Sequence, residues 1–253
     1  MNMLFWSIIH SFMPSGGGGD VMMQKGDMIY QNGDTAQIHL AHIPEVVVSR
    51  IPQYFRTLND LFQSGETVIN SQSLGKILQI TPAQIRKDLS YFGKFGKQGK
   101  GYNVEYLLDA LRGVLGLDRE WKVAVIGVGR LGRAIIGYPG FGPDGFKIVA
   151  SFDEDPRQVG QSFGGLIVRP MSELANVVSK ENIKIAIVAV PASQANKVVN
   201  MLVEVGIKAI LNYAPTSPIT PKNVRVRNID PIVSLQAMTF YLQSEKEVEI
   251  SLV

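Results

Sequence analysis

The sequence contains no cysteine, and its three histidines all lie within the first 42 residues. Without cysteine the chain can form no disulfide, no thiolate zinc site and no cysteine nucleophile, which suits a reducing cytosol. From residue 43 onward no histidine is available as a metal ligand or as a general base. We therefore expect neither a metal site nor catalytic residues, so any redox signal must come through a bound ligand.

Long apolar runs are also missing. No stretch of about 18 consecutive apolar residues occurs, so no membrane span is expected. The opening segment "MNMLFWSIIHSFM" is apolar, but it has neither a basic start nor a small-residue cleavage site, which argues against a signal peptide. "PSGGGGD" follows, and no helix or strand period appears as far as Ala41. We expect residues 1–42 to be a disordered or marginal extension.

The net charge is only +3, so a nucleic-acid function must be argued from where the charges lie. Between Gln72 and Tyr102 there are six cations against one acid, Asp88. The six are Lys76, Arg86, Lys87, Lys94, Lys97 and Lys100. A local surplus of this size indicates a surface for a polyanion; the alternative is a solvated face with a loose loop.

Upstream of these cations the sequence predicts a helix and a short strand. From Pro44, which suits a first helical residue, apolar side chains recur at helical spacing as far as Gly65. Pro52 should kink this long segment or start it. "TVI", at 67–69, then has the composition of a short strand.

A helix–turn–helix pair and a basic wing follow. Ser71 or Ser73 can cap "SLGKILQI", and Thr81 caps a further helix that runs to about Phe92. "KFGKQGKG" is a loop or hairpin, and Asn103 caps a fourth helix, so the order is that of a winged helix. The side chains that could reach bases or phosphates are Gln84, Arg86, Lys87 and Ser90 in the third helix, and Lys94, Lys97 and Lys100 in the wing.

From Trp121 onward, strands and helices alternate. "KVAVIG", "FKIVASFD", "IKIAIVAV" and "IKAILNY" are apolar runs of strand length, separated mainly by helical segments. This pattern predicts a doubly wound parallel sheet. The terminal helix "IVSLQAMTFYLQSE" has apolar residues on several faces, so it must be buried, either on its own domain or against a partner subunit.

A glycine-rich turn follows the first of these strands. Gly127 allows a tight turn, Gly129 lets the backbone approach a pyrophosphate, and Gly132 lets helix and strand pack closely. Asp153 ends the second strand, where a carboxylate can accept hydrogen bonds from both ribose hydroxyls and repel a 2′-phosphate. The turn assigned to the cofactor comprises Gly127, Val128, Gly129, Arg130, Leu131 and Gly132.

The expected nicotinamide end of the crevice is poor in acid–base groups. Pro191 follows the fourth strand and "NYAP" follows the fifth, and these segments offer Asn212 and Tyr213 but no histidine and no acid–base pair. Hydride-transferring enzymes usually place such a group beside the carbonyl that they reduce. The crevice is therefore expected to sense a nicotinamide and not to use it.

With both halves described, residues 43–243 closely resemble the Rex family of bacterial redox-sensing transcriptional repressors. The resemblance rests on "SRIPQYFR", "TPAQIRKDLSYFGKFGKQGKGYNVEYL", "VGRLGRA", "GYPGF", "FDEDP", "VAVPA" and "LNYAP". It implies a winged-helix domain followed by a Rossmann domain, in a homodimer with domain-swapped C-terminal helices. It also implies that operator DNA is bound when NADH is scarce and released by NADH, with NAD⁺ competing for the site.

By motif, the resemblance assigns roles to individual residues. Arg86, Lys87, Lys94 and Lys97 would contact DNA; Gly127, Gly129, Gly132 and Asp153 would hold the adenosine half of the cofactor; Pro191, Asn212, Ala214 and Pro215 would surround the nicotinamide; Arg56, Tyr138 and Asp230 would form the switch. The expected parts are an extension (1–42), a winged helix (43–117), an NAD(H)-binding Rossmann domain (118–228) and a swapped helix with its tail (229–253). Pro231 follows Asp230 where many members of the family have a bulky apolar residue. The resemblance therefore leaves open how this position closes over the nicotinamide.

Three alternatives stay open on the sequence. The first is an NAD-dependent dehydrogenase with an appended binding module, which the lack of an acid–base pair disfavours. The second is a CoA- or nucleotide-binding regulatory domain, since such Rossmann halves share the strand and glycine-rich turn; Asp153 favours NAD instead. The third is a preference for NADP(H), for which Arg130 and Arg157 could supply the cations.

Overall fold

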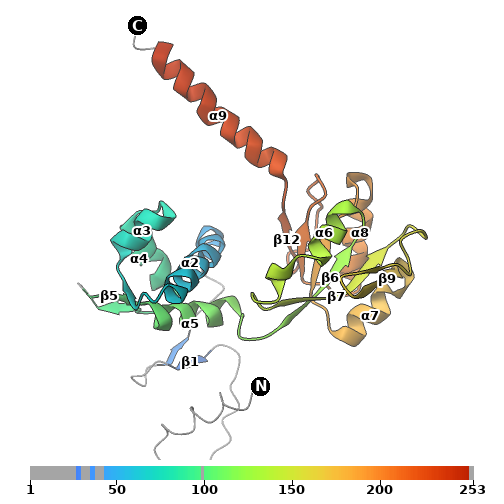
Figure 1. Cartoon of the computed structure of the whole chain (residues 1–253), viewed down its shortest axis with the longest axis horizontal. Coiled ribbons are helices and arrows are strands. Elements are labelled where there is room, and N and C mark those ends of the chain that lie inside the picture. The colour runs from blue at the N-terminus through green and yellow to red at the C-terminus, as the bar shows by residue number, and fades with distance from the viewer. Residues whose placement is uncertain (1–26, 30–34, 38–42, 98–99, 251–253) are drawn as a thin grey trace, which may run out of the picture. The chain divides into compact units, whose positions relative to one another are not determined.

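The computed structural model describes residues 27–29, 35–37, 43–97 and 100–250 of the chain (Figure 1). It divides into two compact units, Met1–Leu115 and Gly116–Val253. All three histidines lie outside the described residues. In the extension, where the sequence predicts no element, β1 (Asp27–Ile29) and β2 (Thr35–Gln37) form a short antiparallel pair.

The first unit has the helix and wing order that the sequence predicts. Its elements are α2 (Glu45–Gln63), β3 (Val68–Ile69), α3 (Ser71–Leu78), α4 (Pro82–Ser90), β4 (Gly96–Lys97), β5 (Gly101–Asn103) and α5 (Val104–Leu115). The strands form an antiparallel sheet in the order β3-β5-β4. Tyr54, Leu58 and Leu107 are fully buried in the core that α2 and α5 share with α3 and α4.

Local signals fix most of these boundaries. The Thr81 side chain accepts a hydrogen bond from the Gln84 amide and Asn103 accepts one from the Tyr106 amide, so both predicted caps are confirmed. The predicted cap of α3 is wrong: Asn70, not Ser71 or Ser73, accepts from the Ser73 amide. Neither serine can cap this helix, because both already lie within it.

Two expectations about α2 also change. Pro44 is the residue before the helix and not its first residue, and the helix runs unbroken through Pro52. Pro52 therefore does not start it. Gly65, just beyond the helix, has a φ of +86°, the left-handed conformation that favours glycine after a helix end.

A buried aspartate joins α2 to α4. Asp88 is fully buried, and its carboxylate accepts hydrogen bonds from Arg50 Nε (2.6 Å) and Nη2 (2.8 Å), from the Tyr54 hydroxyl (2.6 Å) and from Gln84 Nε2 (2.6 Å). Burial alone would raise the pKa of Asp88, but these donors outweigh it and hold the pKa below its usual value. The carboxylate is therefore ionised in the fold and fully satisfied.

The second unit is built on a seven-stranded sheet in the order β12-β11-β10-β6-β7-β9-β8. The strands are β6 (Trp121–Ile126), β7 (Phe146–Asp153), β8 (Ser162–Phe163), β9 (Leu166–Pro170), β10 (Ile185–Val188), β11 (Ala209–Asn212) and β12 (Arg225–Asn228). All pairs are parallel except β8 with β9. Without β8, this is the strand order of a dinucleotide-binding Rossmann fold.

Both faces of this sheet are covered, which explains why its strands have nearly continuous apolar sequences. Along β6, Ala124 and Ile126 pack toward α7 (Leu174–Glu181) and α8 (Ala192–Glu204). Val123 and Val125 pack on the opposite face, toward α6 (Arg130–Ile136) and the short helix η3 (Pro139–Phe141). At the carboxyl end of β6 the chain turns back into the first crossover helix, and the glycine-rich turn lies there.

The last helix, α9 (Pro231–Ile250), stands away from the sheet of its own unit (Figure 1). Every described side chain from Pro231 to Gln243 is exposed. The large apolar residues of this segment, between 55% and 69% exposed, are Ile232, Val233, Leu235, Met238, Phe240, Tyr241 and Leu242. Of the two expectations for this helix, packing on its own domain is therefore wrong. No helix in the described part of the chain is long and apolar enough to cross a membrane.

Replacing Asp88 by alanine should loosen the first unit. The change leaves the Arg50 guanidinium, the Tyr54 hydroxyl and the Gln84 amide without their acceptor, at a cost of about 3 kcal/mol. Hydrogen exchange of the α2 and α4 amides should accelerate, while that of β6 and β7 should not. Asp60→Ala, at an exposed aspartate of α2, is the control and should change stability by less than about 0.5 kcal/mol. Equal protection of α2 and α4 in the two variants would show that the cluster does not stabilise this unit.

Candidate functional site

The glycine-rich turn between β6 and α6 needs glycine for two separate reasons. Gly127 has a φ of +90°, and a Cβ there would lie 2.6 Å from the Ala189 carbonyl oxygen. A Cβ at Gly132 would collide with the Gly127 carbonyl oxygen, so this glycine lets α6 pack against the turn. Gly129, at the start of α6, has open space around its Cβ position. The backbone there is free to approach a ligand phosphate, and the amides of the first helical turn offer hydrogen-bond donors.

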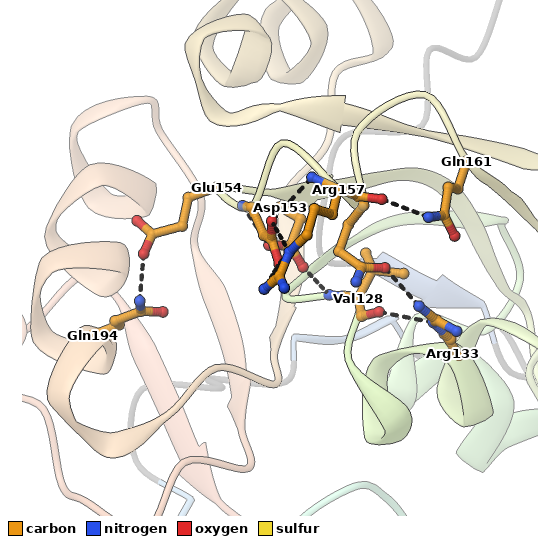
Figure 2. Close-up of polar contacts among 9 residues, drawn as sticks. Val128, Arg133, Asp153, Glu154, Arg157, Gln161 and Gln194 are labelled. Atoms are coloured by element: carbon orange, nitrogen blue, oxygen red, sulfur yellow. Dashed lines mark hydrogen bonds and ion pairs between the residues drawn. The ribbon is translucent and has the colours of Figure 1, made fainter.

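The peptide groups of Val128 are held on both sides (Figure 2). Its amide donates to Asp153 Oδ2 at 2.7 Å, and its carbonyl accepts from Arg133 Nε at 3.1 Å. Arg133 is held in turn by Gln158 Oε1 at 2.6 Å and by the Phe163 ring, whose centroid lies 4.2 Å from its guanidinium carbon. The orientation of the turn is therefore set before any ligand arrives.

Asp153 ends β7 beside this turn. Its Oδ1 accepts a hydrogen bond from the Asp155 amide at 2.9 Å, and its Oδ2 accepts from Val128. Each carboxylate oxygen can accept more than one hydrogen bond, so both keep an acceptor site for a sugar hydroxyl. The carboxylate thus serves the turn and remains available to a ribose.

A partly apolar hollow lies next to Asp153. Its lining residues are Ile126, Gly127, Asp153, Glu154, Met171, Val190, Gln194, Lys197, Val198 and Met201. The carbon-rich walls suit a flat, apolar group such as a nucleobase, with the acids at the rim. Met171, Gln194, Lys197 and Met201 are not predicted from the sequence, because no motif marks them and only the folded sheet brings their segments beside β7.

Acids at the rim hold the neighbouring polar and cationic side chains. Gln194 donates to the Glu154 carboxylate (Figure 2). Lys197 Nζ lies 3.6 Å from Glu154 Oε2. Arg157 donates from Nε and Nη2 to the Asp155 carboxylate, with an Nη2–Oδ2 distance of 2.8 Å. The hydrogen bonds with Arg157 lower the pKa of Asp155, and the same pairing raises the pKa of Arg157. Both members of this pair are therefore charged at neutral pH.

The predicted nicotinamide residues gather at the same edge of the sheet. Ile126, Val188 and Asn212 are in register across β6, β10 and β11, so the segments that follow these strands lie together. Pro191 is exposed at the start of α8, and Pro215 is exposed beyond β11.

Asn212 differs from its expectation as a ligand contact. It is fully buried, and its amide donates to the Ala214 and Thr216 carbonyls and to Asn228 Oδ1, while its Oδ1 accepts from the Ala214 amide. Asn212 therefore shapes the segment after β11 from within. Ala214, which is buried, is held by this residue in both directions.

The three predicted switch residues lie on separate elements. Tyr138 is 61% exposed and stacks edge-on against Phe141. Asp230 Oδ1 accepts from the Ile232 amide and so supports the start of α9. Arg56 is exposed on α2.

The basic surface of the first unit is hollowed beside α4 and the wing. Arg86, Ser90, Lys94 and residues of β4 and β5 line this hollow, and Arg86 Nη1 donates to Ser71 Oγ at 3.0 Å. Lys87 and Lys100 are exposed, and the side chain of Lys97 lies outside the described residues. The backbone of the wing lies close to β3 at Gly101, because a Cβ there would lie 2.8 Å from the Ile69 carbonyl oxygen.

Gln84 departs from its predicted place on this surface. It is half-buried, and its amide donates to Asp88 Oδ1, so it points into the helix pair and not toward a base edge. The Ser90 hydroxyl donates to the Lys87 carbonyl at 2.7 Å but stays exposed. Arg86, Lys87, Lys94 and Lys100 therefore remain the exposed cations on the described part of α4 and the wing.

Comparison with protein families matches each half of the chain to a different description. Residues 42–90 match "Putative DNA-binding protein N-terminus", and residues 118–216 match "CoA binding domain". The second match covers the glycine-rich turn, Asp153 and the segment after β11.

Two relatives that match over almost their full length are redox-sensing transcriptional repressors. A redox-sensing transcriptional repressor Rex from Chloroflexus aurantiacus is 50% identical over 204 residues, which cover 81% of this chain and 96% of the relative. One from Brevibacillus brevis is 44% identical, covering 79% of this chain and 97% of the relative. Among solved structures, RSP in complex with β-NAD⁺ and operator DNA matches with a TM-score of 0.77 at 34% identity, covering 82% of this chain and 95% of that one. RSP in complex with β-NADH matches with a TM-score of 0.75 at 32% identity, covering 82% and 98%. With this identity and coverage, the chain belongs to the Rex family of redox-sensing transcriptional repressors.

Proposed function

We propose that this protein is a DNA-binding transcriptional repressor whose hold on operator DNA is governed by NADH and NAD⁺. The observation that carries the proposal is the pairing, in one chain, of an Asp153-anchored dinucleotide turn with a basic winged-helix surface. NADH and NAD⁺ act as ligands, and no chemical step is performed on them. Its place of action is then the cytoplasm, where the operator lies.

The dinucleotide turn favours NAD(H) over the alternatives. Asp153 offers acceptors at the position where a ribose 2′-hydroxyl is bound in this fold. A carboxylate cannot bind the 3′-phosphate of CoA in the same way, because both groups are anionic acceptors. The similarity to a CoA-binding family covers the strand and turn pattern that both ligand classes share. The relatives are named as repressors, and none of the assigned residues forms an acid–base pair, which disfavours a dehydrogenase.

The DNA contacts assigned to α4 and the wing divide by role. Arg86 and Lys87 on the exposed face of α4 would enter the major groove or contact its flanking phosphates, and Ser90 lies on the same face. Lys94, Lys97 and Lys100 in the wing would bind backbone phosphates. Gln84 acts indirectly, by fixing Asp88.

Release of DNA is a population shift between two arrangements of the dimer. NADH releases the operator only to the extent that it binds the closed dimer more tightly than the DNA-competent one. Inverting a 99:1 preference requires about 5.5 kcal/mol, which two cofactors per dimer would share. Neutral dihydronicotinamide can enter a dry pocket near the two-fold axis, whereas the cation of NAD⁺ must be desolvated or paired there. Arg56, Tyr138 and Asp230 would exchange partners between subunits as this happens.

The exposed apolar surface of α9 supports a homodimer with exchanged C-terminal helices. Its apolar residues do not form one stripe, so a single flat partner could not cover them. A helix inserted between two Rossmann domains is covered on several sides. In that arrangement Asp230, at the start of α9, would lie close to the subunit boundary.

The central test is a gel shift on an AT-rich palindromic operator, titrated with NADH and then with NAD⁺. NADH should release the operator, and added NAD⁺ should restore binding by competing for the same site, because it favours the closed dimer less. A dimer that keeps its operator equally well at saturating NADH would overturn the proposal.

Two single substitutions should separate NADH binding from operator binding. Asp153→Ala removes the ribose acceptor and the anchor of Val128, so NADH affinity should fall at least about tenfold while basal operator binding survives. Arg86→Ala should lower operator affinity by about tenfold or more and leave NADH affinity unchanged. Calorimetry with NADH and gel shifts measure the two. Loss of both activities in either variant would indicate misfolding and not a role in the assigned site.

The dimer assignment predicts the effect of charges on α9. Leu235→Glu combined with Leu242→Glu should give a monomer in light scattering, because the carboxylates would be buried in the interface. Gln236→Glu, at an exposed polar position of the same helix, should remain dimeric. If the wild type is monomeric, or the double variant dimerises as the wild type does, α9 is not the dimer contact.

A further inference from the structure

The cations around the ribose-binding carboxylate are matched with acids. Arg157 is paired with Asp155, and Lys197 with Glu154. Arg130 is the first residue of α6, beside the glycine-rich turn where the pyrophosphate is expected. The two cations near Asp153, Arg157 and Lys197, are therefore both paired with carboxylates.

The segment "DEDPR" holds Arg157 in place through two successive short-range turns (Figure 2). The Asp155 amide donates to Asp153 Oδ1, and the Arg157 amide donates to Asp155 Oδ1, both at 2.9 Å. The Arg157 guanidinium then returns to the same Asp155 carboxylate through Nε and Nη2. Because the two residues are only two positions apart, this bidentate pair forms with little loss of chain freedom.

Arg157 is otherwise suited to bind a phosphate. Its side chain is 87% exposed, so a ligand can reach it, and it follows a ribose-binding acid at the end of the second strand. An arginine near this position is how a Rossmann fold accommodates the 2′-phosphate of NADP. In this chain the Nε and Nη2 side of the guanidinium is already bound to Asp155, whose negative charge also weakens the attraction of Arg157 for a phosphate.

We propose that Asp155 is a specificity-determining residue, which excludes NADPH by keeping the Arg157 guanidinium from a ribose 2′-phosphate. The inference rests on the proposed NADH-binding function and extends it from Asp153 to a second carboxylate. Asp153 repels the 2′-phosphate directly, whereas Asp155 removes the cation that would compensate for the repulsion. Glu154 acts in the same sense on Lys197, but through a longer, single contact of 3.6 Å.

The test is Asp155→Asn in the full-length protein, with NADH and NADPH affinities measured by calorimetry. Asparagine can still accept from the Arg157 amide, so the turn is kept while the charge is lost. NADPH affinity should rise about tenfold, the size of one charge-assisted hydrogen bond, and NADH affinity should stay within about twofold. The same variant should release the operator at a correspondingly lower NADPH concentration.

Two controls assign any gain to Arg157. In Asp155→Asn combined with Arg157→Gln, the gain in NADPH affinity should disappear, since no cation is left to bind the phosphate. Glu181→Gln breaks a comparable ion pair, with Lys122 at 2.8 Å, near the opposite end of the sheet and should alter neither affinity. A gain that persists without Arg157, or that also appears in Glu181→Gln, overturns the inference.

The remaining outcomes separate this inference from the function on which it rests. If wild-type protein binds NADH and releases its operator but Asp155→Asn gains no affinity for NADPH, the specificity role of Asp155 is refuted and the repressor function stands. Wild-type protein that binds NADPH as tightly as NADH also refutes it. If wild-type protein binds neither cofactor, the proposed function itself fails.

Discussion

The hydrogen bond from the Val128 amide to the Asp153 carboxylate joins the glycine-rich turn to the end of the neighbouring strand. Through this bond the first crossover and the second strand keep a fixed relation, which the Arg133 contact with the Val128 carbonyl reinforces. The amides at the start of α6 and the acceptors for the ribose are thus fixed by the same group. A dinucleotide needs both at a set separation, so little reorganisation is required when it binds.

Other hydrogen-bond acceptors at the carboxyl edge of the sheet also bind more than one group each. Asp153, Asp155 and Asn212 each accept a hydrogen bond from a backbone amide nearby, and each also binds a second group. Carboxylates and amides that already accept backbone amides cannot turn away without leaving those amides unsatisfied. The crevice is consequently stiff beside Asp153, where we propose that the adenosine half binds. Under the proposed function, the parts that move are therefore α9 and the boundary between subunits. There the chain exposes apolar surface that it cannot cover alone.

Sequence reasoning succeeded where one residue type satisfies a local demand. Thr81 and Asn103 cap helices, Gly65 ends one, and Asp153 ends a strand, because each meets its partner within a few residues or at the edge of one strand. It failed where two good local choices compete. Asn70 precedes Ser71 and takes the cap of α3, and only the folded helix end decides between them.

Contacts distant in sequence were the other source of failure. Gln84 has the exposed spacing of a reading residue, yet Asp88 draws it inward, because Arg50 and Tyr54 have already buried that carboxylate from the side of α2. The β8–β9 hairpin was missed since its strands are short and partly polar, and the sheet recruits them through β7. Met171 and Met201 are brought to the rim by the crossovers, and no pattern within either segment marks them.

The Asp88 cluster ties α4, which carries the proposed DNA-contacting cations, to α2. Arg50 and Tyr54, four residues apart on α2, both bind the aspartate of α4, while Arg56 on the same helix is exposed. A displacement of α2 that begins at Arg56 must carry α4 with it, because sliding one helix past the other would break the three hydrogen bonds that Arg50 and Tyr54 of α2 donate to a buried charge. In the proposed repressor the exposed face of α4 would then move together with α2. Two such faces in a dimer fit one duplex only at one separation, so reorienting them would release DNA without any change inside the surface that contacts it.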